Sequence, residues 1–246
     1  MSVGFDTASL VQEQVPAAIT KWGKPNFWIR YFSPSNYTTV NSSELNAIKE
    51  CRAVWQANSA YPYLGAVSTP VASHLSGSSA TGHADAQTYI NALIYTYGHV
   101  PPLFFPTNWQ LYTWLDQEAS TALSLAYWNG WAGFINLYSY LGHVPFYAAL
   151  YCNPTAPPPN CSIIQNASAY TCFGVWASGP LKCSNNIGSP PAWAPKHCSV
   201  IATKLWQFWD EGPAPLCGNT PANVDQNVSA SSFAYHLYCF RLTGSP

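Results

Sequence analysis

Residues 111–118 read LYTWLDQE, a strand-like run that ends on two acids, Asp116 and Glu118. Side chains at positions i and i+2 of a strand point to the same face. If the strand continues through Gln117, both carboxyl groups point the same way, and one of them is driven to keep its proton. A second interpretation is also open: Asp116 caps a helix over about 118–141, and Glu118 is an acid of its first turn.

The same order of a short β-like run and a helix-like segment recurs along the chain. Helical segments are also expected at about 10–22, 43–58 and 85–98. Repeated β–α–β order predicts an α/β fold with a parallel sheet, and seven or eight strands in 246 residues fit a (β/α)8 barrel of TIM type. The expected strands are VGFD (3–6), FWIRYF (27–32), YLGAVS (63–68), LYTWLD (111–116), FYAALYC (146–152), CFGVWA (172–177) and KLWQFW (204–209), and a short apolar run, NVDQNV (223–228), follows them.

The second half of the chain departs from this regular order. The spacers at 152–171 and 178–200 are rich in Pro, Cys, Asn and Ser and lack helical periodicity. We therefore expect an irregular barrel whose outer helices are short or missing in a loop-rich, disulfide-pinned second half. No linker or internal repeat divides the sequence, so residues 1–246 are expected to form a single domain.

The eight cysteines contain no CxxC pair, which disfavours a metal cluster, and no cofactor motif is present. An even cysteine count in a chain poor in Lys is typical of disulfides formed outside the cytosol. Cys152–Cys161 and Cys172–Cys183 are plausible pairs because they close short loops, although the sequence leaves the connectivity open. The expected location is secreted or cell surface. No signal peptide is visible, so export implies that a leader has been removed.

Composition excludes several classes of partner. Charged residues make up 8% of the chain and the net charge is −1, so no basic field exists to hold nucleic acid or an anionic membrane. The apolar stretch 121–151 is interrupted by Asn and Gly residues, and we expect no membrane span. No GxSxG, P-loop or GxGxxG motif occurs, and the histidines form no triad.

Acids fall where the predicted strands end. Asp6 ends the first strand, Asp116 and Glu118 end the fourth, and Asp225 lies in the last apolar run. Barrel enzymes act from the C-terminal ends of their strands, and a protonated acid beside an ionised one is what glycoside cleavage requires. These acids are therefore candidate catalytic and sugar-binding residues.

Aromatic residues accompany the acids. Trp114, Trp176 and Trp206 lie in strands near the carboxylates, and flat apolar faces suit sugar rings. A role in the core is the alternative, and for Trp176 and Trp206 we weigh it equally. Arg30 is the one charged residue in FWIRYF and is expected to meet a carboxylate, because a lone buried charge is costly.

Taken in order, the motifs resemble a bacterial group of glycoside-hydrolase-like domains of formerly unknown function, which are in turn similar to glycoside hydrolase family 25 lysozymes. The resemblance covers nearly the whole chain. It rests on GFDT (4–7), IRYF (29–32), GHADAQTYINALIYTYGHVP (82–101), LYTWLDQE (111–118), PFYAALYCNP (145–154), FGVWASGP (173–180), KLWQFW (204–209) and VDQNV (224–228).

This resemblance implies roles for the acids. Glu118 would protonate the glycosidic oxygen, and Asp116 would stabilise the oxocarbenium-like transition state or orient a substrate N-acetyl group. Asp6 and Asp225 would bind sugar and set the electrostatic field. The chain departs from the lysozymes in its second strand, where Arg30 and Tyr31 stand in the region of an acid; both are candidate substrate-binding residues.

The first hypothesis is a secreted glycoside hydrolase of lysozyme type that acts on peptidoglycan or a related amino-sugar polysaccharide, without metal or cofactor. The second is a non-catalytic carbohydrate-binding or structural extracellular protein on the same scaffold, which the low charge and the missing second-strand acid favour. The third is a self-assembling extracellular subunit, in keeping with the many Tyr, Asn and Pro residues.

Overall fold

The computed structural model describes residues 3–7, 18, 27–34, 63–98, 111–118, 121–140, 146–154, 160–165, 172, 174–178, 191–198, 201–209, 225–230 and 240–241. All structural statements concern these residues. The expected helices at 10–22 and 43–58, and Cys183, lie outside them, apart from Ala18, which is helical and buried.

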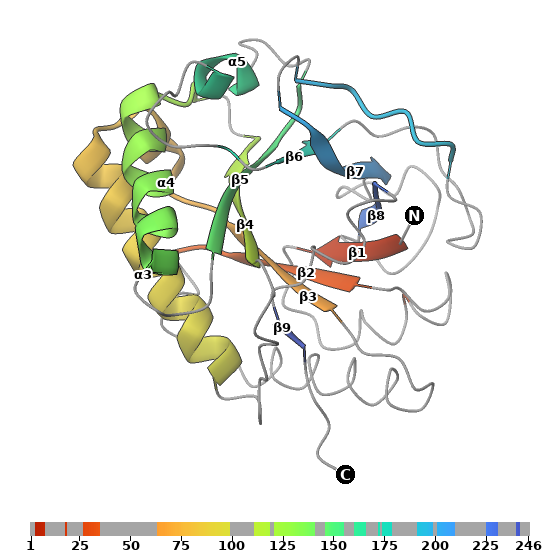
Figure 1. The fold of residues 1–246 in the computed structure, drawn as a ribbon, viewed down its shortest axis with the longest axis horizontal. Coiled ribbons are helices and arrows are strands. Elements are labelled where there is room, and N and C mark those ends of the chain that lie inside the picture. Colours follow the sequence, from red (N-terminus) through yellow and green to blue (C-terminus); the bar gives the residue numbers. More distant parts are fainter. Residues whose placement is uncertain are drawn as a thin grey trace.

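Eight strands close into a barrel in chain order, because the eighth pairs with the first (Figure 1). The predicted irregular TIM-type barrel is therefore confirmed. A two-residue strand, β9 (Phe240–Arg241), pairs antiparallel with the start of the third strand. The barrel strands are β1 (Val3–Thr7), β2 (Phe27–Phe32), β3 (Tyr63–Ser68), β4 (Leu111–Gln117), β5 (Phe146–Cys152), β6 (Val175–Ser178), β7 (Thr203–Trp209) and β8 (Asp225–Ser229).

Strand β8 runs against the expected direction. Neighbouring strands within the series β1 to β7 pair parallel. Strand β8, which lies between β7 and β1, is antiparallel to both. The prediction of a parallel sheet was wrong for this strand. Its reversal has a functional consequence, since it sets Asp225, the first residue of β8, in register with Asp6 near the end of β1.

Two helices cover one side of the barrel, α3 (Ser79–Gly98) and α4 (Leu125–Tyr140), after a short 3-10 helix, η1 (Ala72–Ser76) (Figure 1). α3 begins before the predicted residue 85 because the Ser78 hydroxyl accepts the Thr81 N–H at 3.2 Å and caps it. α4 begins at Leu125 instead of about residue 118. Its cap is Ser124, whose hydroxyl accepts the Tyr127 N–H at 3.0 Å.

The helices α3 and α4 approach so closely that glycine is required at their contact. A Cβ atom on Gly130 would lie 1.9 Å from the Ser79 carbonyl oxygen, and one on Gly82 would lie 2.1 Å from the Tyr127 carbonyl oxygen. Both obstacles are backbone atoms, which cannot swing away as a side chain can. In the sequence, this close contact is visible only as a glycine in each helix, Gly82 in α3 and Gly130 in α4.

Strand alternation sorts the apolar residues into two cores. One fills the barrel interior and includes Ile29, Val67, Trp114, Tyr151 and Trp176. The other lies between the strands and the helices, and includes Phe5, Leu115, Leu150, Trp206, Tyr89 and Trp131. A strand residue that belongs to the outer core therefore has neighbours along the strand that face the barrel interior, and a residue of the inner core has neighbours that face outward.

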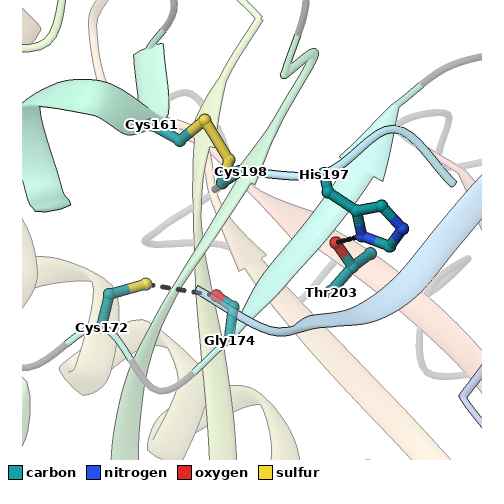
Figure 2. Close-up of a disulfide and its surroundings, with 6 residues drawn as sticks. All are labelled: Cys161, Cys172, Gly174, His197, Cys198 and Thr203. Atoms are coloured by element: carbon teal, nitrogen blue, oxygen red, sulfur yellow. Dashed lines mark hydrogen bonds between the residues drawn. A yellow bond between two sulfur atoms is a disulfide. The ribbon is translucent and has the colours of Figure 1, made fainter. Parts of the chain in front are cut away.

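The second half is irregular, as expected: α5 (Asn160–Gln165) is short, and residues 191–198 contain no helix. A disulfide joins Cys161 of α5 to Cys198, ahead of β7 (Figure 2). The predicted pair Cys152–Cys161 was wrong, and Cys152 and Cys172 carry free thiols. Within the described residues, no helix is both long enough and apolar enough to span a membrane.

Candidate active site

Asp6 is fully buried and lies next to the last residue of β1. The hydroxyl of Tyr31, on the neighbouring strand β2, donates to Asp6 Oδ2 at 2.9 Å. The Asn227 amide, on β8, donates to Asp6 Oδ1. A carboxylate that accepts at both oxygens is fixed in one orientation, and both hydrogen bonds favour its ionised form.

Asp225 stands in register with Asp6 at the start of β8 and is partly buried. The Gln207 amide Nε2, on β7, donates to Asp225 Oδ2 at 2.7 Å. The other end of that amide, Oε1, accepts the Tyr151 hydroxyl at 2.6 Å. Three strands, β5, β7 and β8, thus contribute one residue each to a continuous hydrogen-bonded chain.

Asp116 is the last residue but one of β4. It lies on the same face of the strand as Trp114, toward the barrel interior, because the strand continues through Gln117. Its Oδ2 accepts the Thr69 hydroxyl at 3.2 Å, and its Oδ1 accepts the Glu118 N–H at 3.0 Å. The Glu118 side chain is exposed. The helix-cap interpretation of Asp116 was wrong, since residues 121–124 are not helical and α4 begins at Leu125.

Burial, and to a smaller extent the Glu118 charge, raise the pKa of Asp116 from its ordinary 3.8 to about 7. The two hydrogen bonds from the Glu118 N–H and the Thr69 hydroxyl act in the opposite direction but do not prevail. Asp116 therefore retains a proton close to neutral pH, and the charge of Glu118 beside it contributes to this.

The pKa of Tyr151 is affected by all four predicted acids. Burial raises the pKa of its phenol well above the ordinary value, and the charges of Glu118, Asp6, Asp116 and Asp225 raise it further, in that order. Charges act over short distances in a protein surrounded by salt solution. The strand pairing agrees with this: Asp116 stands in register with Tyr151, and Asp6 stands in register with Asp225, to which Tyr151 is linked through Gln207.

Three aromatic rings pack beneath the acids. Tyr151 and Trp176 have ring centroids 4.3 Å apart, and Tyr31 contacts Tyr151 edge-on at 6.2 Å. The Trp176 indole N–H donates to Asn227 Oδ1 at 2.9 Å. Trp114 packs edge-on against Trp176 at 5.9 Å. Both indoles are fully buried, so their rings support the acids from within the barrel and present no face for a sugar to stack on.

Arg30 and Trp206 lie on the other side of the sheet. Tyr31 points toward Asp6, so its neighbour Arg30 points away from the barrel interior, where it is 5% exposed. Trp206 belongs to the outer core and packs against Trp193 and Phe208. The predicted substrate-binding roles of both residues do not fit these positions. The pairing of Arg30 with a carboxylate stays a prediction.

Sequence reasoning missed four residues of the site: Thr69, Tyr151, Gln207 and Asn227. A polar group inside an otherwise apolar strand is a usable signal, because it is costly to bury without a hydrogen bond. Gln207 in KLWQFW and Asn227 in VDQNV carry that signal. Tyr151 and Thr69 do not, because a tyrosine or threonine is ordinary at the end of a strand.

Comparison with known proteins adds information on the fold. No protein-family model matches the chain, and no curated protein is similar enough in sequence to count as a relative. Among solved structures, an uncharacterized B. stearothermophilus protein is similar with a TM-score of 0.67 and 17% identity, over 97% of this chain and 100% of that one.

Two further structures are similar at lower scores. The catalytic domain of endolysin Ply40, from bacteriophage P40 of Listeria monocytogenes, has a TM-score of 0.52 and 13% identity, over 95% of both chains. The modular autolysin LytC from Streptococcus pneumoniae, also solved with a synthetic peptidoglycan ligand, has a TM-score of 0.50 and 12% identity, over 93% of this chain and 46% of LytC. These likenesses establish a barrel fold that is also found in cell-wall lytic proteins.

Proposed function

We propose that this protein is a secreted or cell-surface glycoside hydrolase that acts on peptidoglycan or a related amino-sugar polysaccharide. The observation that supports the proposal is the placement of the acids on neighbouring strands: Asp116 is in register with Tyr151 and bonded to the Glu118 N–H, and Asp6 is in register with Asp225. The structural likeness to an endolysin and an autolysin supports the same substrate class, and the Cys161–Cys198 disulfide fits an extracellular location.

In the proposed reaction, Glu118 is the proton donor. Its side chain is exposed and can reach a glycosidic oxygen, while its partner Asp116 is partly buried next to it. The proton held by these two acids passes to the leaving oxygen as the glycosidic bond breaks, a water molecule then bonds to the anomeric carbon, and the proton that this water loses returns to the acids. Asp116, once ionised, stabilises the oxocarbenium-like transition state or orients the substrate N-acetyl group, and Asp6 and Asp225 add to the negative field.

The test is Glu118→Gln on purified peptidoglycan. The amide keeps the shape of the side chain but has no proton to donate, so release of reducing ends should fall by at least about 100-fold. Binding to insoluble peptidoglycan and the thermal unfolding midpoint should stay unchanged, which would show that the fold and glycan binding survive. Wild-type protein that releases no reducing ends from peptidoglycan or a chitin-like polymer would overturn the proposal.

A second candidate is a non-catalytic carbohydrate-binding protein on the same barrel. The observation that favours it is the environment of Asp6, whose two oxygens already accept hydrogen bonds from Tyr31 and Asn227. A substrate hydroxyl would have to compete with these donors. Retention of intact glycan by the wild type during long incubation, with no new reducing ends, would distinguish this function from hydrolysis.

A further inference from the structure

Asp6 and Asp225 each accept from a chain of two hydrogen bonds that runs from an aromatic side chain through a side-chain amide to the carboxylate. In the first chain, the Trp176 indole on β6 donates to Asn227 Oδ1 on β8 at 2.9 Å, and the Asn227 amide donates to Asp6 on β1. In the second, the Tyr151 hydroxyl on β5 donates to Gln207 Oε1 on β7 at 2.6 Å. Gln207 Nε2 then donates to Asp225 on β8 at 2.7 Å.

In each chain the hydrogen bonds can be donated in only one direction, from the aromatic ring toward the acid. An indole N–H can donate but not accept, and an ionised carboxylate can accept but not donate. The amide between them must therefore turn its oxygen to the ring and its NH2 to the acid. In the second chain the same direction holds because burial and the nearby acids keep the pKa of Tyr151 well above its ordinary value, so the phenol retains its proton.

The two chains end on acids that face each other across β1 and β8, in register. Two like charges directly opposite each other in an antiparallel pair repel, and one of the acids would ordinarily take up a proton to relieve this. An NH2 donor directed at each carboxylate favours the ionised form of both. The donors thus offset a repulsion that the reversed direction of β8 creates.

We propose that Tyr151 and Gln207 are positioning residues that hold Asp225 ionised beside Asp6, and that these two acids form a fixed negative pair separate from the proton-holding pair Asp116–Glu118. This inference rests on the proposed glycosidase function. The chain from Tyr151 to Asp225 moves no proton. It orients a carboxylate whose charge attracts the positive charge that develops on the sugar ring in the transition state.

Tyr151→Phe tests the proposal because it removes the hydroxyl and leaves the ring. One hydrogen bond to a chain that ends on a charged group is lost, so kcat on solubilised peptidoglycan should fall about 10- to 100-fold. KM should stay within about twofold, since Tyr151 is buried and does not meet the substrate. The acidic limb of the pH profile should move to higher pH, because Asp225 loses support for its ionised form.

The matched control is Tyr112→Phe. Tyr112 lies in the same barrel interior and stacks on Trp114 at 6.0 Å. Apart from burial, the groups that raise the pKa of Tyr112 are Tyr147 and Cys172, and not the four acids. Its hydroxyl therefore lies outside the chain that ends on Asp225, and Tyr112→Phe should leave kcat and the pH profile within about twofold of the wild type.

A double-mutant cycle decides whether Tyr151 acts through Gln207. Gln207→Met breaks the chain at its centre, so adding Tyr151→Phe to it should lower kcat by less than about twofold further. Multiplicative losses in this cycle, or a kcat for Tyr151→Phe equal to that of the wild type, would overturn the inference while leaving the proposed function standing. If the wild type cleaves no glycan, the proposed function fails, but carbon NMR of the Asp225 carboxyl group still tests the hydrogen-bonded chain. The titration of Asp225 should move to higher pH in Tyr151→Phe, and an unmoved titration overturns the inference.

Discussion

The backbone N–H of Glu118 donates to Asp116 Oδ1 at 3.0 Å, which joins the Asp116 carboxyl group to the residue that follows β4. Despite that bond, burial and the Glu118 charge raise the pKa of Asp116 to about 7. The pair therefore changes its proton content close to neutral pH, and its surroundings can be tested by substitution.

Asp116→Asn should make the folded state more stable than the wild type above pH 7. The folded-state pKa of Asp116 is raised, so its contribution to stability is fully present below its ordinary pKa of 3.8 and is lost as the pH rises to about 7. Because 1.36 kcal/mol corresponds to one pKa unit, the loss is at most about 4 kcal/mol. Urea unfolding at pH 4 and pH 8 measures it. The difference between the two pH values should shrink in Asp116→Asn, and an unchanged difference would contradict the assignment.

Thr69→Val should raise the pKa of Asp116 above about 7. The Thr69 hydroxyl donates to Asp116 Oδ2 at 3.2 Å and favours the ionised carboxylate, so its removal favours the proton. Carbon NMR of the Asp116 carboxyl measures the change directly. Glu118→Gln should move the same resonance in the opposite direction, because it removes a neighbouring negative charge. Shifts of equal sign in the two variants would contradict this account.

Gly130→Ala should destabilise the protein by about 1–3 kcal/mol, as expected for overpacking. The new Cβ atom would lie 1.9 Å from the Ser79 carbonyl oxygen, so α3 and α4 must move apart. Gly133→Ala, at a partly exposed position of the same helix, is the control. Gly133→Ala gains the same helix propensity as Gly130→Ala, and it should leave the stability unchanged or raise it. Equal unfolding midpoints for the two variants in guanidinium would refute the close contact.

Tyr127→Phe should lower the free energy of unfolding by about 1 kcal/mol without changing the proposed activity. The Tyr127 hydroxyl on α4 donates to Asp85 Oδ2 on α3 at 2.8 Å, and His74 of η1 contacts the same oxygen at 3.0 Å. This cluster joins three elements on the outside of the barrel. Chemical denaturation measures the loss, and a matching loss of peptidoglycan cleavage at a temperature where the variant is folded would contradict a purely structural role.

Replacing Cys161 and Cys198 together by Ser should cost roughly 3–4 kcal/mol, because the disulfide closes a loop with a sequence separation of 37 residues. Cys198→Ser alone should behave differently. The Cys152 sulfur lies within 4.8 Å of both disulfide sulfurs, so Cys161 can pair with Cys152 instead when oxidised glutathione is supplied. Peptide mapping by mass spectrometry detects that pair. A free Cys161 thiol after oxidation would show that Cys152 cannot reach it.

Local sequence determined the strands and the acids at their ends. β4 could be read from LYTWLDQE because alternating β-formers need only their own neighbours to predict an extended backbone, and the condition that the strand persist through Gln117 is met. The barrel followed from the repeated β–α order. Asp6, Asp116, Glu118 and Asp225 could be named as candidates from their places at strand ends, and their catalytic role stays a prediction.

Tertiary structure alone decided the direction of β8, the partner of each acid and the side of the sheet on which a residue lies. Nothing in VDQNV distinguishes a parallel from an antiparallel strand, because both show the same alternation. Arg30 and Trp206 were misplaced for a related reason: which face of a strand turns inward depends on its neighbours in the barrel. Tyr151 illustrates the limit best, since its hydroxyl gains its role from Gln207, which is 56 residues away along the chain and 2.6 Å away in space.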